Sequence, residues 1–119
     1  MSIMDAPRAR RWPRAQRFSL SSKGAAAEAG YREAIVEARD RPGRDAFDVA
    51  RAQWAAPLGV KPGDGMHLGE LRDGPRTLEE LVRALEACNE PKSEVVLALE
   101  RLETAGLVEA LSQPAAPGA

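Results

Sequence analysis

The chain has 119 residues, which is enough for one modest hydrophobic core, and its single cysteine excludes an internal disulfide. No apolar run approaches the roughly 20 residues that cross a bilayer, and no secretory signal is recognisable at the N-terminus. We therefore expect a cytoplasmic protein that makes no contact with membranes.

The net charge of −1 conceals an uneven distribution of charged residues. Residues 1–24 hold six basic side chains and one acidic side chain, whereas residues 66–111 hold five basic and ten acidic side chains. The sequence therefore predicts a basic N-terminal segment and an acidic C-terminal domain.

Residues 1–23 show neither a helical nor a strand period and include two prolines, so we expect a flexible basic arm. Its arginines could contact phosphates, and Trp12 and Phe18 could stack on bases. The alternatives are a solvated tail or an arm that lies across an acidic protein surface. The candidate phosphate-binding residues of the arm are Arg8, Arg10, Arg11, Arg14 and Arg17.

Residues 24–58 are predicted to form an N-terminal helical segment with two helices. Ser21 or Ser22 can cap the first helix, because a serine hydroxyl accepts a hydrogen bond from a free N–H of the first turn. Asp45 can cap the second helix, which carries Trp54 on its buried side. The Pro-Gly pair between the two helices indicates a turn.

Two further segments mark the boundaries of the folded parts. Residues 59–65 are rich in proline and glycine and are predicted to form a linker. Residues 112–119 offer nothing to pack and are predicted to form a disordered tail.

Residues 66–111 carry the clearest pattern of the chain. Thr77 and Glu80 have the spacing of a capping box, which starts a helix with a leucine and valine stripe. A second helix is predicted at Pro91–Thr104 and a short strand at 107–111. Because all five aromatic residues of the chain lie in its first half, we expect the core of this domain to contain leucine and valine only.

This pattern resembles the winged-helix superfamily of helix-turn-helix proteins. The resemblance covers about a third of the chain, namely Asp73, Gly74, Pro75, Thr77, Glu80, Leu81, Val95, Ala98, Leu99, Leu102, Gly106, Leu107 and Val108. It implies a mainly α fold with short β-strands, preceded by the N-terminal helices and the arm. A complete wing needs a second strand and a basic loop, which the residues after Leu111 do not supply, and the segment around His67–Leu68 is one candidate for a compensating strand.

The resemblance also implies that Pro91–Thr104 is a recognition helix. With Val95, Leu99 and Leu102 turned inward, the outward side would present Lys92, Ser93 and Arg101 to DNA phosphates. On this hypothesis the chain is a DNA-binding transcription regulator, and a symmetric dimer is expected because operator half-sites are paired.

The same helix also has features that are unfavourable for DNA. Leu97 is central on its outward side with Val96 at the edge, and leucine cannot make the hydrogen bonds that read base edges. Carboxylates at Glu90, Glu94 and Glu100 would repel phosphates. The second hypothesis is therefore a protein-interaction module, an accessory subunit that docks on a larger protein. Its candidate interface residues are Val96, Leu97, Trp54 and Trp12. The alternative for Val96 and Leu97 is that they pack beneath the N-terminal helices of the same chain.

Nothing in the sequence indicates an enzyme, a cofactor site, a metal site or a small-molecule substrate. Cys88 and His67 could form a catalytic dyad only with an orienting group and an oxyanion site, for which no motif is present. Cys88 is expected to be a small core residue, and His67 to lie in a loop. DNA, a protein partner and a second copy of the chain stay open as ligands.

Overall fold

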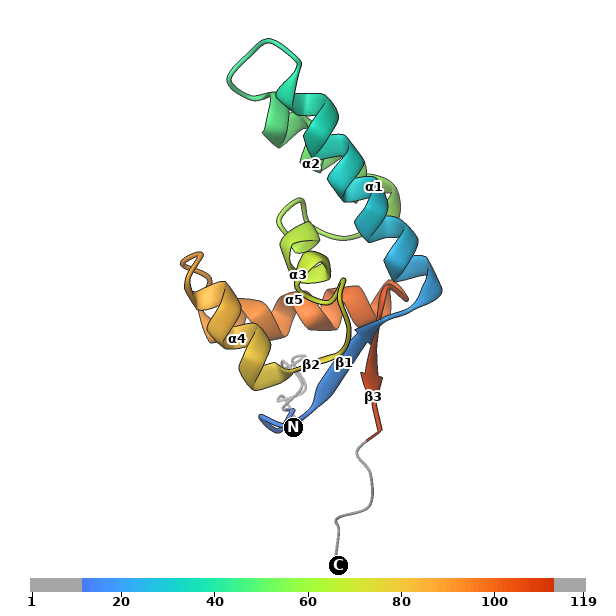
Figure 1. The fold of residues 1–119 in the computed structure, drawn as a ribbon, viewed down its shortest axis with the longest axis vertical. Helices are drawn as coiled ribbons and strands as arrows, with labels where there is room; N and C mark the ends of the chain where they lie inside the picture. The colour runs from blue at the N-terminus through green and yellow to red at the C-terminus, as the bar shows by residue number, and fades with distance from the viewer. Residues whose placement is uncertain (1–11, 113–119) are drawn as a thin grey trace, which may run out of the picture.

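The computed structural model describes residues 12–112 of the chain. These residues form five α-helices, one short 3-10 helix and a three-stranded sheet, which confirms the prediction of a mainly helical protein (Figure 1). The elements in chain order are β1 (Arg17–Leu20), α1 (Ser22–Arg39), α2 (Ala46–Ala55), η2 (Ala56–Leu58), α3 (Asp64–Glu70), β2 (Arg76–Thr77), α4 (Leu78–Glu86), α5 (Lys92–Thr104) and β3 (Val108–Leu111). None of the helices within residues 12–112 is long and apolar enough to cross a membrane.

β1 is the central strand of the sheet, although it lies in the segment that is predicted to be a flexible arm. It pairs antiparallel with β2 and, along its full length, with β3, so that Phe18 lies opposite Arg76 and Ala110. The prediction of a flexible arm is therefore wrong for residues 17–20, and the domain predicted to begin at Met66 includes this strand. His67–Leu68, the candidate segment for a compensating strand, lie in α3 instead, and β1 is the third strand of the sheet.

The chain ahead of β1 is bound to the body of the protein as well. The backbone N–H groups of Leu78 and Glu79 donate to the carbonyls of Gln16 and Arg14 at 2.8 and 3.1 Å. These two donors belong to the first turn of α4, whose N–H groups have no partner inside the helix. The segment from Trp12 onward therefore caps α4 and leads into the sheet, while residues 1–11 lie outside the described residues.

α1 and α2 form a helical hairpin that leads away from the sheet (Figure 1). The Ser21 hydroxyl accepts a hydrogen bond from the Gly24 N–H at 2.9 Å, so the predicted cap of α1 is confirmed. Gly24 faces the Leu107 backbone so closely that a Cβ atom at this position would overlap the Leu107 carbonyl. Asp45 stands at the N-cap of α2, but its side chain makes no capping hydrogen bond.

α3 begins inside the segment that is predicted to be a linker. Asp64 and Gly65 are its first residues, and both are buried. A linker is therefore the wrong description of these two residues: burial against α1 and α5 orders them despite their glycine-rich neighbours. Of the predicted C-terminal tail, only Ser112 belongs to the described residues.

The predicted capping box at the start of α4 is confirmed. The Glu80 N–H donates to the Thr77 hydroxyl at 3.1 Å, and the Thr77 N–H donates to the Glu80 carboxylate at 2.8 Å. The second hydrogen bond lowers the pKa of the Glu80 carboxyl. α5 has Pro91 as its N-cap, and Gly106 stands beyond its end with a φ of 80°, in the left-handed region that glycine tolerates.

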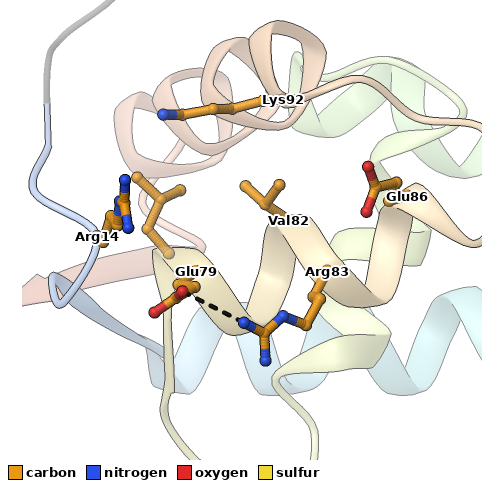
Figure 2. Close-up of a pocket in the computed structure, with 7 residues that line it drawn as sticks. Arg14, Glu79, Val82, Arg83, Glu86 and Lys92 are labelled. Atoms are coloured by element: carbon orange, nitrogen blue, oxygen red, sulfur yellow. Dashed lines mark hydrogen bonds and ion pairs between the residues drawn. The ribbon is translucent and has the colours of Figure 1, made fainter.

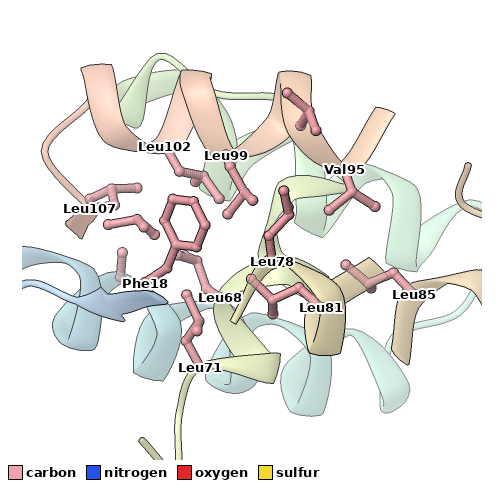
Figure 3. Close-up of a cluster of buried hydrophobic side chains, with 13 residues drawn as sticks. Phe18, Leu68, Leu71, Leu78, Leu81, Leu85, Val95, Leu99, Leu102 and Leu107 are labelled. Carbon is pink, nitrogen blue, oxygen red and sulfur yellow. The ribbon is translucent and has the colours of Figure 1, made fainter. Parts of the chain in front are cut away.

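One core joins the sheet to α3, α4 and α5 (Figure 3). Its fully buried side chains are mainly leucines and valines from the three helices, but Phe18 of β1 lies among them with no exposed surface. The expectation of a core without aromatic residues is therefore wrong. It failed because β1 brings Phe18 from the first half of the chain into a core that the second half otherwise builds.

Candidate interaction surface

Both sequence-based hypotheses assign the contact with a ligand or partner to the outer face of α5. Val95, Leu99 and Leu102 have no exposed surface, as the spacing predicts, and Ser93 and Leu97 on the opposite side are exposed. Leu97 keeps 38% of its surface accessible, so an apolar side chain occupies the centre of the predicted recognition face. Leucine at this position offers van der Waals contact and no hydrogen bond.

Val96 does not belong to this face. It is 9% exposed and forms part of the main core, which contradicts its assignment to a docking surface. The physical reason is that α5 contacts both α3 and α4, so that the buried arc of the helix is wider than packing against one neighbour would produce. Leu97 is thus the only residue of the pair that a partner can contact.

Arg101 is held by an intramolecular ion pair. Its Nε and Nη2 donate to the two carboxylate oxygens of Asp64 at 2.9 and 2.8 Å, in a bidentate arrangement. Asp64 is 2% exposed and also accepts a hydrogen bond from the Lys61 N–H at 3.0 Å. The hydrogen bonds to Asp64 raise the pKa of Arg101. We therefore correct its assignment as a phosphate-binding residue, because its charge is compensated by a buried carboxylate.

A hollow of about 490 Å³ lies beside Leu97. Leu58 and Gly59, which follow α2, form one wall of this hollow, and α5 forms the other. Leu58 was not among the predicted interface residues, because its proximity to α5 depends on how the hairpin returns to α3. Leu58 and Leu97 supply the apolar part of the lining, and the polar part comes from Glu100, Arg101 and Thr104.

A second groove, of about 230 Å³, lies where the segment ahead of β1 meets α4 and the start of α5 (Figure 2). Its rim carries the basic side chains of Arg14, Arg83 and Lys92, and its floor includes Leu78 and Val82. Arg14 and Lys92 are both predicted phosphate-binding residues, and the fold brings them to one groove from opposite halves of the chain. The prediction did not include Arg83.

Acidic side chains partly compensate the positive charge of this second groove. Glu79 and Glu86 also line it, and Arg83 makes an ion pair with Glu79 at 3.3 Å (Figure 2). Ser93, next to Lys92, is exposed. Arg17 is exposed on β1, whereas the predicted sites Arg8, Arg10 and Arg11 lie outside the described residues.

The two tryptophans that are predicted to contact a partner pack within the chain. The indole N–H of Trp54 donates to the Ala27 carbonyl at 2.9 Å, and its ring meets Tyr31 edge to face at 4.9 Å. Trp12 meets Phe18 in the same manner, also at 4.9 Å. Both are partly buried. These contacts of both rings are internal, and only part of each ring is open to a partner.

His67 and Cys88 differ from the sequence-based expectation. His67 lies in α3 and is 2% exposed, and neither of its ring nitrogens makes a hydrogen bond. Burial lowers its pKa, and the neighbouring Asp64 carboxylate acts in the opposite direction. Cys88 is exposed and is not a core residue, because α4 ends at Glu86 and the chain turns outward there. Within residues 12–112, no group of three or more His, Cys, Asp or Glu side chains could hold a metal ion.

Comparison with protein-family models, with curated proteins and with solved structures finds no match to this chain. The function must therefore be inferred from two surfaces of the chain itself. One is the apolar hollow between η2 and α5, with Leu97 and Leu58. The other is the basic groove with Arg14, Arg83 and Lys92.

Proposed function

We propose that the chain is a winged-helix-like protein-interaction module, without catalytic activity, that docks on a larger protein through the outer face of α5. The arrangement of α3, α4 and α5 beside a small sheet supports the winged-helix proposal. The strand order β2-β1-β3 supports it too. A complete wing would continue from β3 into a further strand, and in this chain β1 occupies the position beside β3 that such a strand would take. In this proposal α5 corresponds to the recognition helix.

One observation carries the choice of a protein partner. Arg101, in the last turn of α5, is paired bidentately with the buried Asp64, and the exposed Leu97 occupies the centre of the outer face. Reading base edges needs hydrogen-bond donors and acceptors, whereas a protein interface is centred on apolar contact. An apolar side chain of the partner fits the hollow formed by Leu97 and Leu58.

Capture of partners by the tagged full chain, in nuclease-treated extract of its native host, tests this proposal. We expect one protein to be retained in stoichiometric amount, to be lost with Leu97→Asp, and to be kept with Ser93→Asp. The second variant is the matched control, because it adds the same charge to another exposed residue of α5. Equal retention by both variants would contradict the assignment of Leu97.

The basic groove supports a second candidate function, binding of nucleic acid. Its support is the convergence of Arg14, Arg83 and Lys92 around one opening. Lysine and arginine that contact phosphates release counterions, so each lost contact should reduce the salt dependence of binding by about one unit of slope. This surface is separate from Leu97, so the two functions can be tested with separate variants.

Fluorescence anisotropy with a mixed-sequence DNA duplex distinguishes the two candidates. Nucleic-acid binding predicts saturable binding that weakens with added salt and with Arg14→Ala or Lys92→Ala. Arg41→Ala, which removes an exposed charge from the loop after α1, is the control. If no binding is measured at low salt, or if all three variants bind equally, the nucleic-acid candidate fails.

A further inference from the structure

The distal part of the α1–α2 hairpin, residues 32–51, exposes more large apolar surface than the rest of the described chain. Four large hydrophobic side chains within residues 12–112 are exposed. Three of them, Val36 at 54%, Phe47 at 37% and Val49 at 41%, lie on this distal hairpin, and the fourth is Leu97. Three of the four exposed large apolar side chains thus belong to one segment, and Val36 is the most exposed of them.

The inner contacts of the distal hairpin are unusually small. Its separate core consists of Ala38, Ala46 and Ala50, with Ala34 packed against them. Each alanine contributes one methyl group, whereas the main core contains Phe18 and many leucines. The distal hairpin thus buries alanines, while Ile35 is half-buried and Val36, Phe47 and Val49 are exposed. Within the hairpin, Phe47 meets the Arg51 guanidinium at 5.9 Å from its ring centre, and Val36 and Val49 stay about half exposed.

The charges of the distal hairpin identify the kind of partner. Five basic side chains (Arg32, Arg39, Arg41, Arg44 and Arg51) and five acidic side chains (Glu33, Glu37, Asp40, Asp45 and Asp48) cancel to zero. A balanced surface is not repelled by its own copy, whereas a strongly charged ligand would require an excess of one sign. The balance therefore fits a second copy of the same chain.

The positions of the charges on the outer face of α1 indicate how two copies would be oriented, which the overall charge balance does not. At 100° per residue, Ala29 and Val36 lie along the middle of this face. Arg32 and Arg39 follow one edge, and Glu33 and Asp40 follow the other. A hollow of about 480 Å³ lies here, lined partly by Ala29 and Val36. The Arg32 side chain is 52% exposed, but its charge is paired with the buried Glu28, so the exposed Arg39 is the main positive charge of this edge.

We propose that two copies of the chain associate through the outer faces of α1, with the two α1 helices parallel and Val36 at the centre. In parallel helices the edge of one helix faces the opposite edge of its partner, so the arginine edge would meet the carboxylate edge on both sides. In antiparallel helices equal edges would meet, and arginine would face arginine. The surface is distinct from the Leu97 hollow, so this proposal does not depend on the proposed function.

A charge-exchange experiment on the full chain tests the proposal. In the proposed dimer Arg39 of one copy faces Asp40 of the other. Arg39→Glu and Asp40→Arg should each place like charges together and weaken self-association by about tenfold or more. An equimolar mixture of the two variants should restore it, because each new charge then faces an opposite one. Arg44→Glu, an equal change in the exposed loop, is the control.

The readout is molar mass from sedimentation equilibrium, with circular dichroism to verify that each variant is folded. We expect the wild-type chain and the control to reach twice the 12.8 kDa chain mass. Val36→Glu and the two single variants should stay at the single-chain mass. A monomeric wild-type chain at about 100 µM, where such weak dimers are populated by mass action, would overturn the proposal. So would single variants that dimerise as tightly as the wild type, or a mixture that fails to dimerise.

Two results separate this proposal from the proposed function. Leu97→Asp should abolish capture of the protein partner and leave the dimer mass unchanged. Val36→Glu should abolish the dimer and leave the hollow beside Leu97 intact. If Leu97→Asp instead removed the dimer while Arg39→Glu did not, self-association would occur through α5 and the assignment to α1 would be wrong.

Discussion

Phe18→Ala is the sharpest test of the architecture, because it removes a side chain that local sequence patterns assign to a flexible arm. Phe18 has no exposed surface and lies in β1, between β2 and β3. Replacing a fully buried phenylalanine by alanine costs about 3–5 kcal/mol, from lost burial and from the cavity that remains. The edge-to-face contact of Trp12 with Phe18 is lost as well, which places the expected cost in the upper part of this range.

Such a loss is a large part of the stability of a small domain, which is typically about 5–15 kcal/mol. Urea denaturation followed by circular dichroism and by tryptophan fluorescence measures it. A milder variant, Phe18→Leu, should cost about 1–2 kcal/mol and keeps the measurement possible if the alanine variant is mostly unfolded. Arg17→Ala, at the exposed neighbouring position of the same strand, is the control.

The expected ranking is a large loss for Phe18→Ala, an intermediate loss for Phe18→Leu and almost none for Arg17→Ala. If Phe18→Ala cost less than about 1 kcal/mol, Phe18 would not be a core residue, since buried large-to-small substitutions exceed that value. The central position of β1 would then be refuted, together with the proposal that β1 completes a winged-helix-like sheet.

Three further predictions concern buried groups and a close backbone contact. Burial lowers the pKa of His67 below its ordinary 6.5, so the unfolded chain binds more protons and the free energy of unfolding should fall as the pH drops below 6.5. Urea titrations of His67→Leu should lose this pH dependence, and an unchanged dependence would contradict the assignment. Asp64→Asn leaves the partly buried Arg101 without its carboxylate partner and should lower the free energy of unfolding by about 1–3 kcal/mol, measured by urea denaturation. Asp73→Asn, an exposed control, should change it by almost nothing. Gly24→Ala should lower the melting temperature because its Cβ overlaps the Leu107 carbonyl, while Gly30→Ala in the same helix should raise it slightly; a rise for both would refute the close contact.

Local signals predicted four of the five α-helices within residues 12–112, and α3 was missed because its glycine-rich start indicates a linker. Thr77 and Glu80 mark the start of α4, Ser21 marks the start of α1, and the valine and leucine spacing of α5 indicates which side is buried. Each of these signals acts within about one helical turn, so the sequence contains it directly. The outward position of Leu97 follows from the same spacing.

Contacts between distant residues could not be predicted in this way. β1 has only four residues, and its partners β2 and β3 lie in the second half of the chain. Asp64 and Arg101 are 37 positions apart, and the Pro- and Gly-rich neighbours of Asp64 indicate a loop rather than a buried helix start. A buried carboxylate beside a helix with an outward arginine would have indicated this ion pair. The sequence does not show that Asp64 is buried, because its burial depends on the tertiary fold.

The positions of the arginines decide how the chain's positive charge should be interpreted. A sequence count treats Arg14, Arg17 and Arg101 as equivalent candidates for phosphate contact. In the folded chain Arg101 neutralises Asp64, Arg17 lies on the sheet, and only Arg14 joins Lys92 at one groove. Because two carboxylates line that groove as well, its field is weaker than the number of basic residues indicates. The hollow beside Leu97 is also lined by polar side chains, namely Glu100, Arg101 and Thr104, but a protein partner needs no excess of positive charge there. Contact with the exposed Leu97 is therefore the stronger of the two proposals.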